Sequence, residues 1–85
     1  SVPAGARDAK DLVVIVRILL TPDGGLRGAP ELVNTERLGE EYFRVAAESA
    51  LRAIRRCAPY ELPQASYEQW REMELKFDPR EMFRG

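Results

Sequence analysis

The segment Phe43–Tyr60 constrains the fold of this chain more than any other part of the sequence. It is a run of small and apolar residues at helical spacing, and it ends at Pro59. Because a proline pushes the preceding residue away from α geometry, the helix must stop there. Its alanines would let the helix pack closely against one face of a sheet. Its apolar side is expected to comprise Tyr42 or Phe43, Ala46 or Ala47, Ala50, Ile54 and Cys57.

Two candidate strands precede this helix. Residues 12–20 are rich in β-branched residues, and apart from one arginine they are apolar at odd and even positions alike. This pattern is typical of a central strand. Residues 21–25 contain Pro-Asp-Gly-Gly and predict a turn. Residues 26–34 are predicted to return as a strand. Because proline cannot donate to a ladder, Gly28 and Pro30 confine that strand to an edge of the sheet or require a bulge.

The helix is expected to begin near Glu40, after capping side chains offered by residues 34–36. An irregular connection with one short turn over residues 66–69 should then lead to the last strand. Three aromatic side chains in this connection are expected to cover the core, and the alternative is that they face a ligand. These aromatic residues are Tyr60, Tyr67 and Trp70.

Residues 72–77 alternate strictly between charged and apolar side chains, the period of a strand with one wet face. Asp78-Pro79 should end the strand, and the tail should make one helical turn that returns Met82 and Phe83 to the body. If residues 26–34 form an edge, the last strand must pair with the other side of the first one.

The expected fold class is therefore α+β. It is a three-stranded antiparallel sheet of order 2-1-3 with one long helix packed on one face. Residues 1–10 are expected to be a linker end or a disordered N-terminus, and residues 11–85 a single domain.

Composition narrows the classes of function. Thirteen basic and fourteen acidic residues nearly cancel, which argues against a nucleic-acid partner. The sequence contains no apolar run near the roughly 18 residues of a membrane span. With no histidine, we expect no catalytic residue, no cofactor and no metal site. The chain begins without Met, and we expect it to be a fragment whose localisation signals lie upstream.

Two further points stay open at this stage. Cys57 has no internal disulfide partner and is expected to be a half-buried thiol; the alternatives are a redox thiol or a bridge to a cysteine outside this chain. The rival to a binding module is an enzyme or small-ligand domain, which would need a concave pocket among Tyr60, Tyr67 and Trp70.

The outer edge of the last strand is the candidate binding site. It has no proline or glycine to blunt it, so we expect it to be open and to capture an extended partner segment by strand addition. The alternatives are that residues 1–10 or the tail after Pro79 cover this edge, or that two copies pair their edges. The candidate partner-binding residues are Glu72, Met73, Glu74, Leu75, Lys76 and Phe77, with Tyr67 and Trp70 as flanking contacts. Charge on Glu74 and Lys76 would tune register and partner choice.

Several stretches together resemble a known family. They are residues 16–24, residues 46–60, Leu62-Pro63, Tyr67, Trp70 and the ending Leu75-Lys76-Phe77-Asp78-Pro79-Arg80-Glu81-Met82-Phe83. With these parts the chain resembles the C-terminal domain of TolA, of the TolA/TonB energy-transducer superfamily, and most of all its alphaproteobacterial form. Enterobacterial members carry a disulfide in this domain. Because Cys57 is the single cysteine here, that bridge is not carried over.

The resemblance implies a periplasmic domain on a stalk anchored in the inner membrane. Such domains bind the N-terminal segment of TolB, act with TolQ and TolR through upstream regions, and help maintain cell-envelope integrity during cell division. Phage and bacteriocin proteins exploit some of them. The second candidate is a TonB-type domain, which shares the architecture and grips the plug boxes of outer-membrane transporters.

Overall fold

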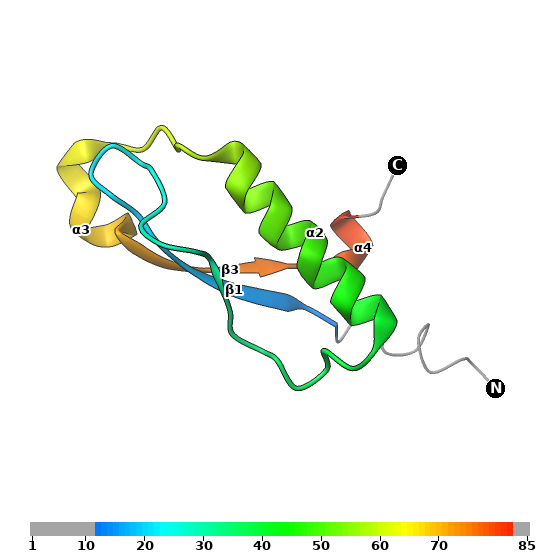
Figure 1. The fold of residues 1–85 in the computed structure, drawn as a ribbon. Coiled ribbons are helices and arrows are strands. Elements are labelled where there is room, and N and C mark those ends of the chain that lie inside the picture. The colour runs from blue at the N-terminus through cyan, green and yellow to red at the C-terminus, as the bar shows by residue number, and fades with distance from the viewer. Residues whose placement is uncertain (1–11, 83–85) are drawn as a thin grey trace.

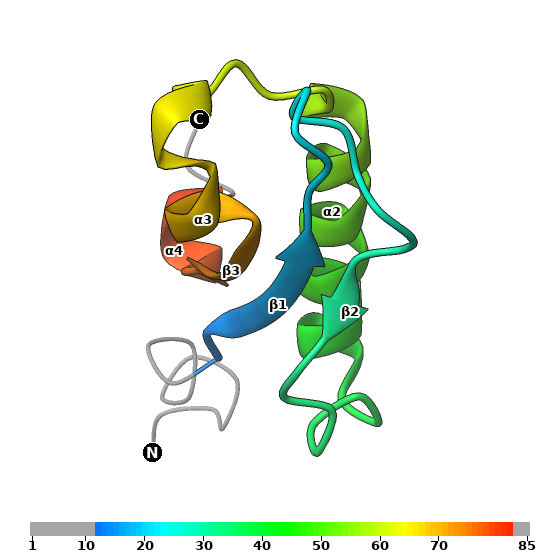
Figure 2. The same ribbon diagram turned by 90° about the vertical axis from the view of Figure 1, so that its left-hand side faces the viewer.

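The strand β1 (Val14–Leu19) lies at the centre of the sheet in the computed structural model, which describes residues 12–82. Its neighbours are β2 (Glu31–Leu32) and β3 (Glu72–Phe77), and both run antiparallel to it. The helix α2 (Glu41–Cys57) packs against one face of this sheet (Figure 1). Figure 2 shows β1 between the two other strands. The predicted α+β fold and its 2-1-3 strand order are confirmed.

The core forms where one face of β1 meets α2. Alternate residues of β1 point toward the helix and are fully buried, as the pleat of a strand requires. On the helix, Phe43 is 0% exposed and Tyr42 is 44% exposed, so the first of these two candidates is the core residue. Truncating a buried Phe costs about 3–5 kcal/mol, close to the whole stability of so small a domain. The buried apolar residues of β1 and α2 are Val14, Val16, Ile18, Phe43, Ala46, Ala47, Ala50 and Ile54.

The return strand is shorter than predicted. Only Glu31–Leu32 forms β2, and residues 26–30 contribute a single isolated bridge between Leu20 and Leu26. Gly28 has a φ of 77°, which takes the backbone out of extended geometry, and Pro30 has no N–H to donate. The ladder to β1 therefore starts only after the proline.

The expected capping of α2 by residues 34–36 is wrong. The N-cap of the helix is Glu40, which makes no side-chain cap hydrogen bond. The Asn34 side chain extends the sheet instead. Its amide oxygen accepts the Ile15 N–H at 2.9 Å, and its amide nitrogen donates to the Val13 carbonyl at 2.5 Å. An amide carries both a donor and an acceptor, so Asn34 replaces a backbone unit at the end of the short β2.

The connection after α2 forms η2 (Gln64–Ser66) and α3 (Tyr67–Trp70), at the far left of Figure 1. Trp70 is buried, and its indole N–H donates to the Pro63 carbonyl at 2.7 Å. The Tyr67 hydroxyl donates to the Leu20 carbonyl at 2.7 Å. The rings of Tyr67 and Trp70 pack edge to face, with their centroids 4.8 Å apart. These contacts fix the position at which β3 begins.

The ends of α2 and β3 are less buried than their patterns suggest. Cys57 is exposed, so the expectation of a half-buried thiol is wrong; Ile54 is the last buried residue of the helix, and one more turn extends past it. The predicted helical turn after β3 is present as α4 (Pro79–Met82). The predicted packing of the Met82 and Phe83 side chains against the body lies outside what the structure describes.

Gly24 joins the hairpin turn to the segment after α2. Its N–H donates to the Thr21 carbonyl at 2.9 Å, and its own carbonyl accepts the Tyr60 N–H at 2.8 Å. Its φ is 85°, and a Cβ at this position would overlap the Tyr60 carbonyl oxygen. Gly28 also has a positive φ, of 77°, but nothing lies within 4 Å of the place where its Cβ would be. An alanine at Gly28 would therefore suffer backbone strain alone, whereas an alanine at Gly24 would suffer both backbone strain and steric overlap.

We predict that Gly24→Ala lowers the free energy of unfolding by about 2–5 kcal/mol, since it adds overlap to the cost of positive φ. The matched variant Gly28→Ala should lose only about 1–2 kcal/mol, because it has the backbone cost alone. Urea denaturation of both variants measures the difference. Equal losses would contradict the close approach of Gly24 to Tyr60.

Candidate functional site

The candidate site is the outer edge of β3. Its six residues pair with β1 in the register Val14↔Phe77 to Leu19↔Glu72, and β1 is the only strand beside β3 within residues 12–82. The Leu20 N–H donates to the Arg71 carbonyl at 2.8 Å, which makes that pair a hydrogen-bonded one. In an antiparallel ladder, hydrogen-bonded and non-hydrogen-bonded pairs alternate. The orientation of every backbone group in β3 follows from this contact.

Met73, Leu75 and Phe77 direct their backbone N–H and C=O groups toward β1. The backbone groups of the other three residues point away from the sheet. Among the described residues, no strand receives them. A partner strand added here would therefore bond to the backbone of Glu72, Glu74 and Lys76.

The side chains of β3 divide between the two faces of the sheet. The three apolar ones are half-buried on the face that α2 covers, and the three charged ones are exposed on the opposite face. The predicted alternation of residues 72–77 is confirmed. The edge thus has backbone groups that no strand of the described part of the chain pairs with, between an apolar border and a charged one.

A groove runs along the apolar border, between β3 and the C-terminal half of α2. Its volume is about 300 Å³. Carbon atoms of both elements form most of its wall. The space is empty because the Ala53 and Cys57 side chains on the helix are too short to reach Leu75 and Phe77. The residues that line the groove are Ala53, Ile54, Cys57, Tyr60, Leu75, Lys76 and Phe77.

This groove is the part of the site that the sequence reasoning missed. The available signal was the pair of small residues Ala53 and Cys57, four positions apart on the helix and adjacent to its buried stripe. Small side chains at the border of an apolar face leave a gap where the helix passes an edge strand. An added strand would place alternate side chains in this gap.

Tyr60 forms one end of the groove and is held rigidly. Its hydroxyl donates to the Ile54 carbonyl at 2.7 Å, and its backbone N–H donates to Gly24. Burial raises the pKa of Tyr60 above its ordinary value, and the electrostatic interaction with Cys57 raises it further. The phenol therefore stays protonated at neutral pH and remains a hydrogen-bond donor.

The charged border is organised by Arg17, the one arginine in β1. Its guanidinium lies 3.2 Å from Glu31, 3.9 Å from Glu72 and 3.7 Å from Glu74. These side chains are exposed, so each pair contributes only about 0.2–1 kcal/mol. Arg17 nevertheless partly neutralises both glutamates that border the open edge.

The other residues predicted for the site lie beside the edge rather than along it. Tyr67 and Trp70 stand immediately before β3 and do not line the groove, and their polar atoms bond to backbone carbonyls of the domain. Whether residues 1–10 or the end of the tail cover the edge concerns residues outside the described range. Within residues 12–82, no helix combines the length and apolar character needed to cross a bilayer.

The chain matches no protein-family model, no curated protein and no solved structure.

We predict that amide hydrogen exchange alternates along β3. The amides of Met73, Leu75 and Phe77 should be protected, because they donate to β1, and those of Glu72, Glu74 and Lys76 should exchange at least ten times faster. NMR exchange measurements on the whole chain resolve each amide. Uniform protection of all six would show that another segment covers the edge.

Proposed function

We propose that this domain captures an extended peptide by strand addition to the outer edge of β3. The observation that carries the proposal is the combination of outward backbone groups on an unblunted edge strand with an apolar groove beside them. Backbone hydrogen bonds would supply affinity. Side chains entering the groove would set the register of the bound segment.

The proposed role follows from this capture and from the resemblance described above. We propose that the chain is the periplasmic C-terminal domain of an inner-membrane-anchored energy transducer of the Tol-Pal type. Its partner would be the N-terminal segment of TolB, and its action would help maintain the cell envelope. The strand order, the long helix and the open third strand support this assignment.

A mechanical role suits the geometry of β3. The strand forms a continuous six-residue ladder with the central β1, and a captured strand would lie along the same axis. Force applied along that axis loads the inter-strand hydrogen bonds together, because they are perpendicular to the strands. The rival in the same superfamily is a TonB-type domain, which would use the same edge for the plug-box segment of a transporter.

We predict that Glu74→Pro abolishes capture of a peptide from the TolB N-terminus. Proline at this position removes an N–H that points outward, so the hydrogen bonds between β3 and β1 stay intact. Edge strands tolerate proline where the N–H faces away from the sheet. The matched variant Glu74→Ala keeps that N–H and should bind within about threefold of the parent, since only an exposed ion pair is lost. Isothermal titration gives both affinities.

Thermal unfolding must first show that both variants fold. Proline at Leu75 would be a poorer test, because the N–H of that residue bonds to β1. Equal binding by the folded Glu74→Pro variant and the parent would contradict strand addition at this edge. A plug-box peptide serves as the second ligand: if it binds and the TolB peptide does not, the TonB-type role replaces the Tol-Pal role.

A second prediction concerns the groove. Ala53 lines it from α2 and is exposed, so Ala53→Phe should fill the groove without disturbing the core. We expect peptide affinity to fall at least tenfold while the outward N–H groups stay free. Arg44→Phe is the matched control, because it adds the same ring to an exposed position of α2 that does not line the groove. Equal affinities of the two variants would show that the groove takes no part in capture.

A further inference from the structure

The arginines of this domain fall into two groups. Four of them pair with nearby carboxylates: Arg17 with three glutamates, Arg37 with Glu40, Arg71 with Glu68, and Arg80 with Asp78. In contrast, the structure shows no ion pair between Arg52, Arg55 or Arg56 and any residue from 12 to 82, and all three are exposed. Arg27, Arg44 and Lys76 likewise form no ion pair with a residue from 12 to 82, but they lie apart from one another in the sequence. The last two turns of α2 are where three such cations occur together.

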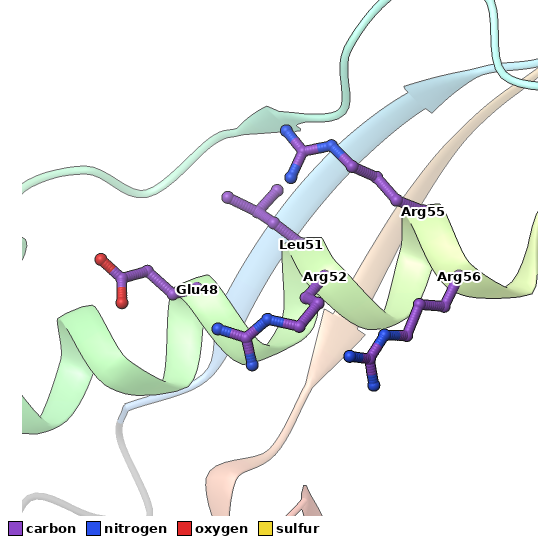
Figure 3. A pocket seen from close by; sticks show the side chains of 5 residues that line it. All are labelled: Glu48, Leu51, Arg52, Arg55 and Arg56. Atoms are coloured by element: carbon purple, nitrogen blue, oxygen red, sulfur yellow. The ribbon is translucent and has the colours of Figure 1, made fainter.

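These three arginines surround a depression of about 420 Å³ on the helix surface. Figure 3 shows Leu51 between the guanidinium of Arg55 on one side and that of Arg52 on the other. Arg52 and Arg56 extend side by side, as residues one turn apart do. The depression thus has an apolar centre, the half-buried Leu51, with guanidinium groups around it.

Helix energetics account for only part of this arrangement. Arg55 and Arg56 lie in the last turn, where positive charge stabilises the helix dipole. Arg52 lies one turn earlier. It follows Glu48 by four residues, the spacing of a helical ion pair, yet no ion pair joins them. The guanidinium of Arg52 is available to a ligand.

We propose that this surface, the arginine patch formed by Leu51, Arg52, Arg55 and Arg56, binds an acidic segment of a partner protein. The segment would carry carboxylates on both sides of one apolar side chain. A guanidinium binds a carboxylate through two parallel hydrogen bonds, and three of them stand around one apolar centre. The apolar residue of the segment would cover Leu51 and the methylene stems of the arginines.

The composition of the patch favours a peptide over a membrane surface. Recognition of anionic lipid headgroups typically uses about four to eight basic residues on one face. Here three arginines share the depression with Glu48, which would repel a uniformly negative surface. A short segment with separated carboxylates can avoid Glu48 while engaging the arginines.

The arginine patch is separate from the β3 groove. The two lie on different flanks of α2 and share no lining residue. Binding at the patch does not rest on strand addition, so one surface can be inactivated while the other is kept. A partner with both an extended segment and an acidic one could engage the domain at two places, which would raise its overall affinity.

The test is an NMR titration of the isotope-labelled chain with the acetylated, amidated peptide Asp-Glu-Leu-Glu-Asp. We expect saturable shifts confined to residues 48–56, loss of binding in raised salt, and no binding of the neutral peptide Asn-Gln-Leu-Gln-Asn. A variant with Arg52→Gln, Arg55→Gln and Arg56→Gln should bind at least ten times more weakly. The control Arg44→Gln removes an exposed arginine outside the patch and should bind like the parent.

Circular dichroism checks that the triple variant folds. If it does not, the single variants Arg52→Gln, Arg55→Gln and Arg56→Gln are tested in its place. The proposal is overturned if residues 48–56 do not shift, or if the arginine variants bind the acidic peptide as the parent does. A parallel titration uses vesicles of phosphatidylcholine with phosphatidylglycerol. Arginine-dependent binding to these vesicles without binding of the peptide would overturn the proposal in favour of a membrane surface.

Discussion

The rest of the structure depends on the two-sided pairing of β1. This strand supplies one hydrogen-bonded ladder to β2 and another to β3, and its buried side chains form the floor on which α2 packs. Within residues 12–82 no other strand has two neighbours, so each outer strand has one edge that no described strand pairs with. On β2 that edge is only two residues long and follows a proline, whereas on β3 it runs for six residues. The asymmetry between the two edges is why we propose β3, rather than β2, as the strand to which an extended segment is added.

The features that followed from sequence are those with a local physical cause. Strict alternation in residues 72–77 predicted β3 with its correct bounds, and Pro59 predicted the end of α2 close to where it occurs. Gly28 and Pro30 predicted a weak edge strand. The apolar spacing of α2 predicted all five of its buried positions, three as alternatives and two outright, and the structure has Phe43 buried rather than Tyr42 and both Ala46 and Ala47 buried.

The features that did not follow depend on contacts between distant segments. The Asn34 side chain was expected to cap the helix, and only the position of β1 reveals that its amide continues the ladder. The β3 groove requires the distance between α2 and an edge strand, which no periodicity encodes. Cys57 was placed on the apolar side because helical spacing alone does not say where the sheet beneath the helix ends.

The helix α2 carries three distinct surfaces. Its buried stripe holds the sheet, its flank beside β3 forms the groove, and its last two turns form the arginine patch. Small side chains are needed for the first two, since they allow close packing against the sheet and leave space at its edge. The groove thus follows from how few large apolar residues the helix carries, whereas the arginine patch follows from its long basic side chains.

We propose above all that an extended partner strand pairs with the outer edge of β3. The most direct measurement uses a labelled TolB N-terminal peptide bound to the unlabelled chain, with isotope-filtered nuclear Overhauser contacts between them. We expect backbone contacts from the peptide to Glu72, Glu74 and Lys76, and side-chain contacts to Ala53 and Phe77 in the groove. Contacts confined to the open face of the sheet, around Ile15 and Arg17, would contradict it.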